Sequence, residues 1–348
     1  MIFDIDRRRA VDIYRAFFFF LLVLGLVSAE AHHGSAFYYD LENVVKIEGE
    51  VLAISWRNPH VMMDLRRTDD GAVNEVWEVE SSSANTLLRI GIEQGVVAVG
   101  DHVTLTGALS RHGLPAMAAF VITLEDGTDL PIWPRPAMRL GYEVKPAPIS
   151  TVAAEISRSE ARGIFRVWSR PDLKGLFLQS DYLPFTLAAL TAQEDWNPLE
   201  EDPVLDCIPR GMPSVMNSPF PVEFVDQRNT IVMRLEEYDV VRTIHLESMP
   251  STSTRFRMPV GHSVGYWERN TLVVTTTRIS DKFFDDGGTP QGETAEIVER
   301  FTLSEDGTRL DYESIHTDPF TFTEPARQTG YWDWIPGEQI RPYDCEAR

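Results

Sequence analysis

A carboxylate and an imidazole late in the chain have the types and the spacing for acid–base chemistry. Glu299 lies in the alternating stretch 295–303, and His316 lies in the alternating stretch 309–317. Side chains alternate between the two faces of a strand, which places Glu299 on the apolar face of the first stretch and His316 on the same face as Leu310. If a hairpin joins these strands, both groups face one interior, where each could act as acid or base with a shifted pKa.

Residues in earlier predicted strands could complete this site. His262 and His245 each alternate with apolar or uncharged neighbours, and either Arg234 or Arg242 could pair with Glu299. Two or three imidazoles with one carboxylate and one arginine suit proton transfer on an enolisable or dehydratable ligand, as in a cofactor-independent isomerase, hydratase or lyase. The alternative is an internal polar network that fixes the register of the strands. The residue types leave open whether the protein is an enzyme.

A second group of imidazoles could bind a metal ion. Cleavage after Ala31 would make His32 the N-terminus, whose amine and imidazole can bind one Cu(II). Cleavage after Ala29 would place His32 third, where it completes a square-planar set with the amine and two amides for Cu(II) or Ni(II). His33 and His60 could then make a set of three imidazoles. The alternatives are a solvated N-terminus and, for His60, a strand cap.

Familiar catalytic motifs are absent from the sequence. The glycine-rich dinucleotide fingerprint, the phosphate-binding loop and the zinc-protease motif are all missing. Residues 261–265 (GHSVG) resemble a nucleophile elbow only superficially, because they lie inside a strand pattern that no helix follows.

Residues 1–31 have the pattern of a secretory signal peptide. Four arginines precede the apolar core 16–27, and small residues follow it. The core is too short to span a bilayer comfortably. We therefore expect a periplasmic or secreted protein that leaves the membrane after cleavage, and a membrane-anchored one if the segment stays uncleaved.

The formal net charge of −21 limits the class of partner. The predicted leader holds four Arg against three Asp and one Glu, so the negative charge belongs to the mature chain. Such a surface argues against nucleic acid or an anionic membrane as partner. A hydrophobic content of 43% is ordinary for a globular protein and excludes wholesale disorder.

The chain has two cysteines, Cys207 and Cys345. In an oxidising compartment, an isolated pair of cysteines most simply forms one disulfide. Two buried free thiols are the alternative. A zinc site is disfavoured because neither cysteine has a second cysteine or a histidine pair at ligand spacing.

Residues 32–130 are predicted to form a small five-stranded barrel. Alternating stretches at 44–56, 60–66 and 74–80 are followed by a helix at 84–90 and by further strands at 102–107 and 116–124. Three strands, one helix and two strands is the order of the OB-fold.

The rest of the chain divides into a proline-rich linker and a larger barrel. Residues 131–206 are expected to wrap on the second domain, with strand and helix patterns at 163–169, 151–161 and 184–193. Residues 207–348 predict an antiparallel, lipocalin-like barrel, so the fold class is all-β with few short helices. Its expected strands are 222–225, 230–236, 240–247, 262–267, 271–279, 295–303 and 309–317. Such a barrel can hold one small ligand, and binding of a small, mainly apolar molecule there is the leading functional prediction.

The chain resembles a group of uncharacterised exported bacterial proteins whose N-terminal part is a domain of unknown function. The resemblance rests on the segments 31–35 (AHHGS), 56–60 (WRNPH), 77–80 and 100–107, and, in the C-terminal half, on 211–213, 242–245, 261–268 and 298–301. Such proteins often have Ser directly after the histidine pair, where this chain has Gly34. The resemblance implies export and two β domains, and it implies no activity.

Overall fold

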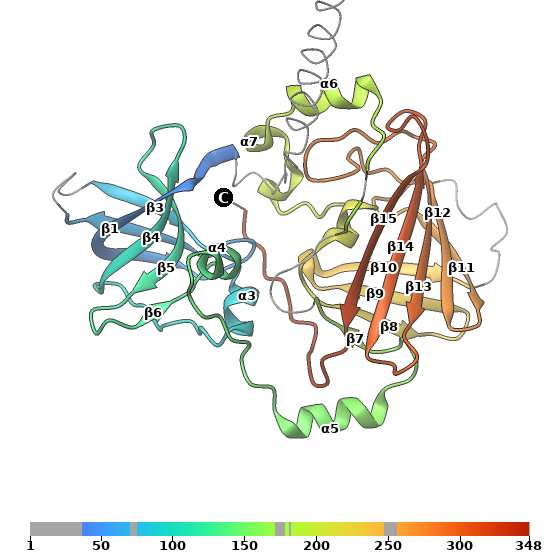
Figure 1. Ribbon diagram of the computed structural model, residues 1–348, viewed down its shortest axis with the longest axis horizontal. Coiled ribbons are helices and arrows are strands. Elements are labelled where there is room, and N and C mark those ends of the chain that lie inside the picture. Colours follow the sequence, from blue (N-terminus) through green and yellow to red (C-terminus); the bar gives the residue numbers. More distant parts are fainter. Residues whose placement is uncertain (1–36, 70–74, 171–177, 181, 247–255, 348) are drawn as a thin grey trace, which may run out of the picture. The chain divides into compact units, whose positions relative to one another are not determined.

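The computed structural model describes residues 37–69, 75–170, 178–180, 182–246 and 256–347 (Figure 1). All of them belong to one compact unit of the chain. The predicted signal peptide, His32 and His33 lie outside the described residues. Within the described ranges, no helix is both long enough and apolar enough to cross a membrane.

The first sheet closes on itself into the predicted five-stranded barrel, which we call the first barrel. The long strand β1 (Tyr39–Ser55) pairs with β2 (Met62–Arg67) and with β4 (His102–Ser110). Strand β3 (Val76–Glu80) pairs with β2 and, in parallel, with β5 (Ala116–Thr123), which also pairs with β4. This strand connectivity is that of the OB-fold. The short β6 (Asp129–Leu130) adds a sixth strand.

Helix α3 (Ala84–Arg89) lies between β3 and β4 in the chain, where the sequence predicts it. Ser83 precedes the helix, and its side chain accepts a hydrogen bond from the backbone N–H of Thr86. Gly91 follows the helix with φ +78°, a conformation that costs little only for glycine. The two ends of α3 are therefore set by the local sequence.

The second sheet has nine strands and forms a nearly closed barrel, which we call the second barrel. Its strands follow one another in chain order, and each pairs with the next in antiparallel orientation except β10 with β11. Backbone hydrogen bonds from Ser169 to Asp333 and from Gln179 to Thr329 pair the free edge of the last strand. The strands are β7 (Val167–Trp168), β8 (Val222–Asp226), β9 (Thr230–Leu235), β10 (Val240–His245), β11 (His262–Glu268), β12 (Thr271–Thr277), β13 (Glu296–Leu303), β14 (Arg309–Thr317) and β15 (Ala326–Asp333).

Two features of the second barrel differ from the sequence prediction. Strands β10 and β11 pair in parallel, with Ile244 opposite Ser263 and His245 opposite Val264, whereas the sequence predicts an antiparallel barrel. Strand β15 was not expected. Its sequence contains Gln328, Thr329 and Gly330, which interrupt the apolar alternation that identifies the other strands.

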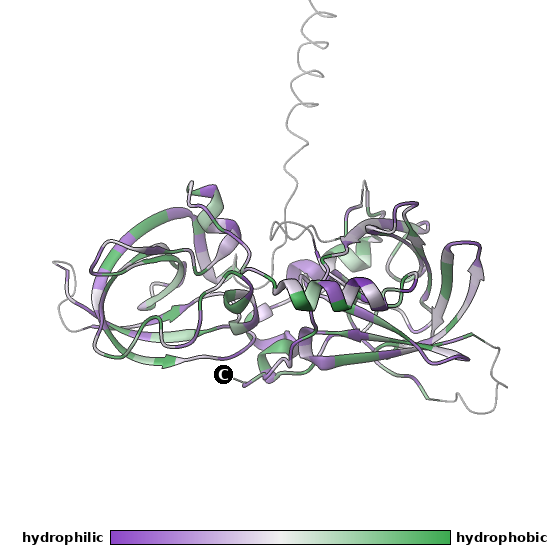
Figure 2. Cartoon of the chain, turned by 90° about the horizontal axis from the view of Figure 1, so that it is seen from below, coloured by the Kyte–Doolittle hydropathy of each residue, from purple (hydrophilic) through white to green (hydrophobic). Residues whose placement is uncertain are grey.

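Packed side chains fill the interior of the second barrel. Trp168, Phe224, Phe301, Tyr312 and Trp332 are all buried and belong to one apolar cluster with the inward aliphatic residues of the strands. Apolar and polar residues alternate along many of the strands (Figure 2), as one buried and one exposed face require.

The segments around the barrels contain short helices and the predicted disulfide. The helices are α4 (Pro134–Arg139), α5 (Thr151–Glu160), α6 (Leu187–Asp195) and α7 (Pro198–Glu201), with 3-10 turns at Pro203–Asp206, Ser214–Asn217 and Glu237–Asp239. The proline-rich stretch thus contains more helix than expected. Cys207 and Cys345 are bonded to each other, as predicted.

Candidate functional site

A buried ion pair lies inside the second barrel. Arg242 on β10 and Glu299 on β13 are both fully buried. Glu299 Oε1 accepts hydrogen bonds from Arg242 Nη1 at 2.9 Å and from the Tyr312 hydroxyl at 3.0 Å. Its Oε2 accepts from Arg242 Nη2 and, at 3.3 Å, from Thr276 Oγ1. Each carboxylate oxygen therefore has two donors within the protein.

The hydrogen bonds around this pair take one residue from each of five consecutive strands. Arg242 on β10 donates to Ser263 on β11 at 3.0 Å and to Thr276 on β12 at 2.7 Å, while Glu299 and Tyr312 come from β13 and β14. A slip of one residue in any strand would turn its member to the outer face. The network therefore fixes the register of these strands.

Burial and the carboxylate of Glu299 shift the pKa of two of its neighbours. Burial opposes the charge of Arg242, but the carboxylate of Glu299 outweighs burial and raises the pKa of Arg242. Burial, reinforced by the charge of Glu299, raises the pKa of Tyr312 well above its usual value. Tyr312 therefore stays a hydrogen-bond donor and Arg242 stays charged. This saturated arrangement favours the structural alternative over acid–base chemistry.

His316 is also buried, but it does not contact Glu299. Its Nε2 lies 2.9 Å from Ser314 Oγ, and its ring meets the Phe284 ring edge-on with centroids 5.1 Å apart. In the β13–β14 register Glu299 faces Ser314, so His316 occupies the next inward position along the strand. Burial lowers the pKa of His316 to about 4, so it is neutral at pH 7.

His245 and His262 lie on the outer face of the second barrel, and the structure does not bring them to Glu299. The buried residues of these strands are Val240, Arg242 and Ile244 on β10 and Ser263 and Gly265 on β11, which leaves the two histidines on the opposite face. Sequence reasoning took the face of low charge as the inner one. Their ring centroids are 5.2 Å apart. Burial, then the nearby His245 and Arg278, lower the pKa of His262.

His60 in the first barrel has a defined orientation. Its Nδ1 lies 2.7 Å from the carbonyl oxygen of Ser81 and 3.3 Å from Glu80 Oε1. A carbonyl oxygen only accepts hydrogen bonds, so Nδ1 carries the proton and Nε2 of the neutral ring keeps its lone pair. The His60 side chain is 31% exposed, and its ring lies 5.7 Å from that of Trp133.

Two residues of this cluster escaped sequence reasoning. Glu80 is almost fully buried, and its Oε2 accepts a hydrogen bond of 3.1 Å from the hydroxyl of buried Tyr39. A carboxylate at the end of the stretch 74–80 gave no sign of burial, because it comes one residue after buried Val79 and breaks the alternation. We call Tyr39, Glu80 and His60 the first-barrel cluster.

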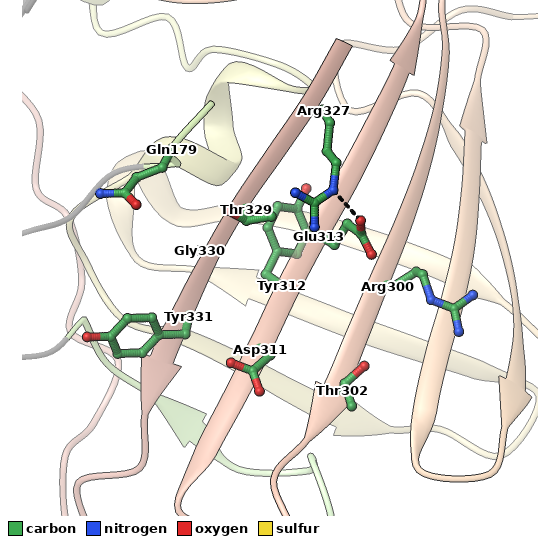
Figure 3. A pocket seen from close by; sticks show the side chains of 10 residues that line it. All are labelled: Gln179, Arg300, Thr302, Asp311, Tyr312, Glu313, Arg327, Thr329, Gly330 and Tyr331. Carbon is green, nitrogen blue, oxygen red and sulfur yellow. Dashed lines mark hydrogen bonds and ion pairs between the residues drawn. The ribbon is translucent and has the colours of Figure 1, made fainter. Parts of the chain in front are cut away.

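A hollow of about 360 Å³ lies over the outer face of β13, β14 and β15 (Figure 3). Its side chains are mostly polar, and Arg327 and Glu313 form an ion pair across it. Arg300 at its margin pairs with Glu268. The cationic groups of the hollow are therefore already paired with acidic neighbours.

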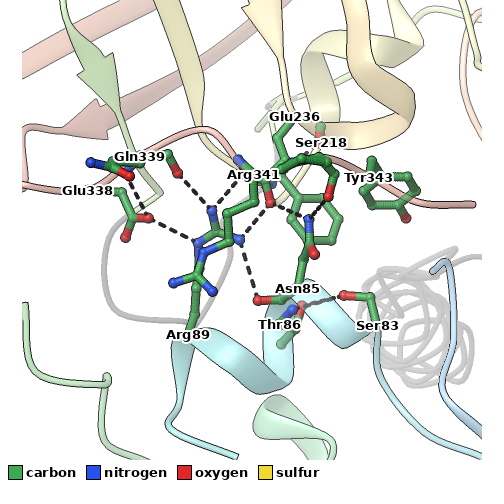
Figure 4. Close-up of polar contacts among 12 residues, drawn as sticks. Ser83, Asn85, Thr86, Arg89, Ser218, Glu236, Glu338, Gln339, Arg341 and Tyr343 are labelled. Atoms are coloured by element: carbon green, nitrogen blue, oxygen red, sulfur yellow. Dashed lines mark hydrogen bonds and ion pairs between the residues drawn. The ribbon is translucent and has the colours of Figure 1, made fainter. Parts of the chain in front are cut away.

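A polar contact joins helix α3 to the second barrel (Figure 4). Both nitrogens Nη1 and Nη2 of Arg89 donate to the carboxylate of Glu236 at 2.6 Å, and Asn85 donates to it at 2.9 Å. Glu236 is fully buried and also accepts from the backbone N–H of Arg341 at 2.9 Å. Arg341 belongs to residues 341–346, which we call the C-terminal stretch, so this stretch takes part in the same contact.

The same stretch pairs with the first barrel next to His60. The backbone of Asn58 donates to Asp344 at 3.2 Å and accepts from Glu346 at 3.1 Å, so Asn58 and Cys345 form a parallel bridge. The disulfide to Cys207 ties this stretch to the chain just before the second barrel's strand β8.

One family model matches part of the chain. Residues 21–117 match the model of a family of unknown function (DUF6152). This range includes His32, His33 and all of the first-barrel cluster. No curated protein matches the chain. Among the described residues, no group of three or more His, Cys, Asp or Glu side chains is placed to hold a metal ion.

Proposed function

We propose that the protein is exported, loses its leader and binds Cu(II) at the first barrel through His60 together with His32 and His33. The observation that carries the proposal is the orientation of His60. Hydrogen bonding of Nδ1 to a backbone carbonyl or a carboxylate is the usual arrangement behind a metal-binding imidazole, because it directs the lone pair of Nε2 toward the metal.

Only a short stretch of sequence separates the N-terminal histidines from the first-barrel cluster. Six residues of chain lead from His33 to Tyr39, and such a segment can span at most about 20 Å. The Tyr39 hydroxyl is bonded to Glu80, whose other oxygen faces His60. Tyr39, at the start of β1, is therefore hydrogen-bonded to Glu80, which contacts His60. His33 and His32 precede Tyr39 by six and seven residues.

The chemistry of the set favours Cu(II). A terminal amine, imidazoles and amide nitrogens suit the square-planar geometry of Cu(II), and Cu(II) heads the affinity order of the divalent first-row metals. A disulfide is typical of an oxidising compartment such as the periplasm, which agrees with export.

The other predicted functions stay predictions. A small apolar ligand in the second barrel would have to displace packed side chains, because Trp168, Phe301 and Tyr312 occupy the interior. An acid–base enzyme there would have to use Glu299, whose oxygens are saturated, or His316, which lies at a separate position. Neither arrangement is supported as well as the imidazole of His60.

Metal analysis of the exported protein tests the proposal. Protein purified from the periplasm should begin at Glu30 or His32 by mass spectrometry and should take up one equivalent of Cu(II). His60→Ala should weaken Cu(II) binding about tenfold or more, whereas the exposed His102→Ala should not. An absence of copper at stoichiometric loading, or equal affinity in His60→Ala, would overturn the proposal.

A further inference from the structure

The outer face of the second barrel carries two histidines side by side. His245 and His262 come from the neighbouring parallel strands β10 and β11, which pair Ile244 with Ser263 and His245 with Val264. Both side chains are half-buried. Among residues 37–69, 75–170, 178–180, 182–246 and 256–347, no side chain or backbone group is hydrogen-bonded to either imidazole.

The distance between the two rings is suited to a shared metal ion. Zinc binds an imidazole nitrogen at about 2.0–2.1 Å, which puts the ion roughly 3.2 Å from the ring centroid. Two rings that meet at the tetrahedral angle then have centroids about 5.2 Å apart, whereas a right angle needs about 4.5 Å. The centroids of His245 and His262 are 5.2 Å apart.

We propose that His245 and His262 form a zinc-class metal site on the second barrel, with a tetrahedral ion held by two imidazoles and two water molecules. The site is separate from the Cu(II) site of the first barrel and uses none of its residues. Zn²⁺ suits it because this ion has no ligand-field preference and accepts imidazole and water ligands in tetrahedral geometry.

The backbone holds the two ligands in place. His245 and His262 sit on hydrogen-bonded strands, and the residues between them in the sheet, Ile244 and Ser263, are buried. The Ser263 hydroxyl is bonded to Arg242, which ties this pair of strands to the buried network beneath. Rigid strands limit the entropy that the imidazoles lose when they bind an ion.

One nearby charge limits the affinity. The guanidinium of Arg278 acts on His262 through its charge, and it would repel a bound cation in the same way. Two protein ligands and one repelling charge predict a site much weaker than a four-ligand structural zinc site. Removal of the Arg278 charge should therefore make the site bind Zn²⁺ more tightly.

Metal titration of the full chain tests the site. Titration of wild type with Zn²⁺, followed by calorimetry, should include a binding event that both His245→Ala and His262→Ala weaken about tenfold or more. Arg278→Gln should tighten the same event. Co²⁺ should give the visible absorption of a tetrahedral ion, and that signal should disappear in His262→Ala.

Matched variants separate the two sites. His102→Ala, which removes an exposed imidazole from the first barrel, should leave the Zn²⁺ event unchanged. His60→Ala should leave it unchanged too, and His245→Ala should leave Cu(II) loading unchanged. A Zn²⁺ titration that is identical in wild type, His245→Ala and His262→Ala would overturn the second site without affecting the proposal for the first.

Discussion

Arg242 and Glu299 meet in full burial although two strands, β11 and β12, separate the strands that carry them. The pair is therefore not a contact between neighbours in the sheet. Its hydrogen bonds reach Ser263 on β11, Thr276 on β12 and Tyr312 on β14, so a single charged pair holds five strands to one register. Buried ion pairs are costly to desolvate, and their best-attested use is to specify one arrangement among several.

Removal of one charge from this pair should be strongly destabilising. Glu299→Gln leaves the Arg242 guanidinium buried without a counter-charge, and we expect a loss of about 3–5 kcal/mol in the free energy of unfolding. Urea denaturation followed by tryptophan fluorescence measures it. Glu268→Gln breaks the exposed pair with Arg300 and should change stability little. A loss no larger than that of the control would contradict a structural role for Glu299.

A double variant tests why the pair exists. Arg242→Met with Glu299→Leu removes both charges and keeps similar volume, so it should be more stable than Glu299→Gln alone. If the pair specifies register, backbone amide exchange in β10–β14 should become faster in the double variant even where the free energy of unfolding recovers. Slow, wild-type exchange in a stable double variant would argue against that role.

His316 should make stability depend on pH. Its pKa is about 4 in the folded protein and near 6.5 in an unfolded chain, so folding favours the neutral ring. The stabilisation is complete above about pH 6.5 and is lost as the pH falls from 6.5 toward 4. The loss amounts to about 3 kcal/mol. The difference in unfolding free energy between wild type and His316→Gln, measured at pH 7.5 and 4.5, should therefore shrink at the lower pH. If the difference in unfolding free energy between wild type and His316→Gln did not change with pH, burial would not lower the pKa of His316.

Arg89 should stabilise the contact between α3 and the second barrel. Arg89→Ala leaves the buried carboxylate of Glu236 with only neutral donors, and we expect a loss of about 3 kcal/mol. Arg66→Ala, which removes a half-exposed partner of Glu50, should cost less than about 1 kcal/mol. Urea denaturation compares the two. If Arg89→Ala and Arg66→Ala lowered the free energy of unfolding equally, the α3 contact would stabilise the protein no more than an exposed ion pair does.

Reduction of the disulfide should loosen the C-terminal stretch. Cys207 and Cys345 are 138 residues apart, and loop-closure entropy assigns such a crosslink about 4–5 kcal/mol. With a reductant, the free energy of unfolding should fall and the amides of Asn58 and Glu346 should exchange faster, because Cys345 anchors their bridge. Unchanged exchange at these two amides would show that Arg89 and its partners hold the stretch without the crosslink.

The sequence predicted the strands that alternate clearly and failed where the polar pattern was ambiguous. The first barrel follows from the sequence because β1 and β3 alternate, β5 is a short apolar run, and Ser83 and Gly91 limit α3. Strand β15 was missed because its interior positions are polar or glycine. The parallel pairing of β10 with β11 depends on the path of a long connection, which alternation along each strand does not encode.

For the candidate sites, the sequence predicts the buried face of a strand only where the residue types on that face are clearly apolar. Glu299 was placed inside correctly, because its face also carries Ile297 and Phe301. His262 was placed on the wrong face, because the buried face of β11 carries Ser263 and Gly265, small residues that look exposed by type. Ser263 is buried because it accepts a hydrogen bond from Arg242, a partner from another strand that no local pattern reveals.

The bridge between Asn58 and Cys345 has a consequence for biosynthesis. Asn58 belongs to the first part of the chain that a ribosome makes, whereas Cys345, Pro342 and Arg341 are made after all of the strands in both barrels. The sheets can each form as their strands emerge, but the contacts that need this stretch cannot. A nascent chain that stops before residue 341 should therefore carry two formed barrels and Cys207 as a free thiol, which would make it a ready target for thiol chemistry.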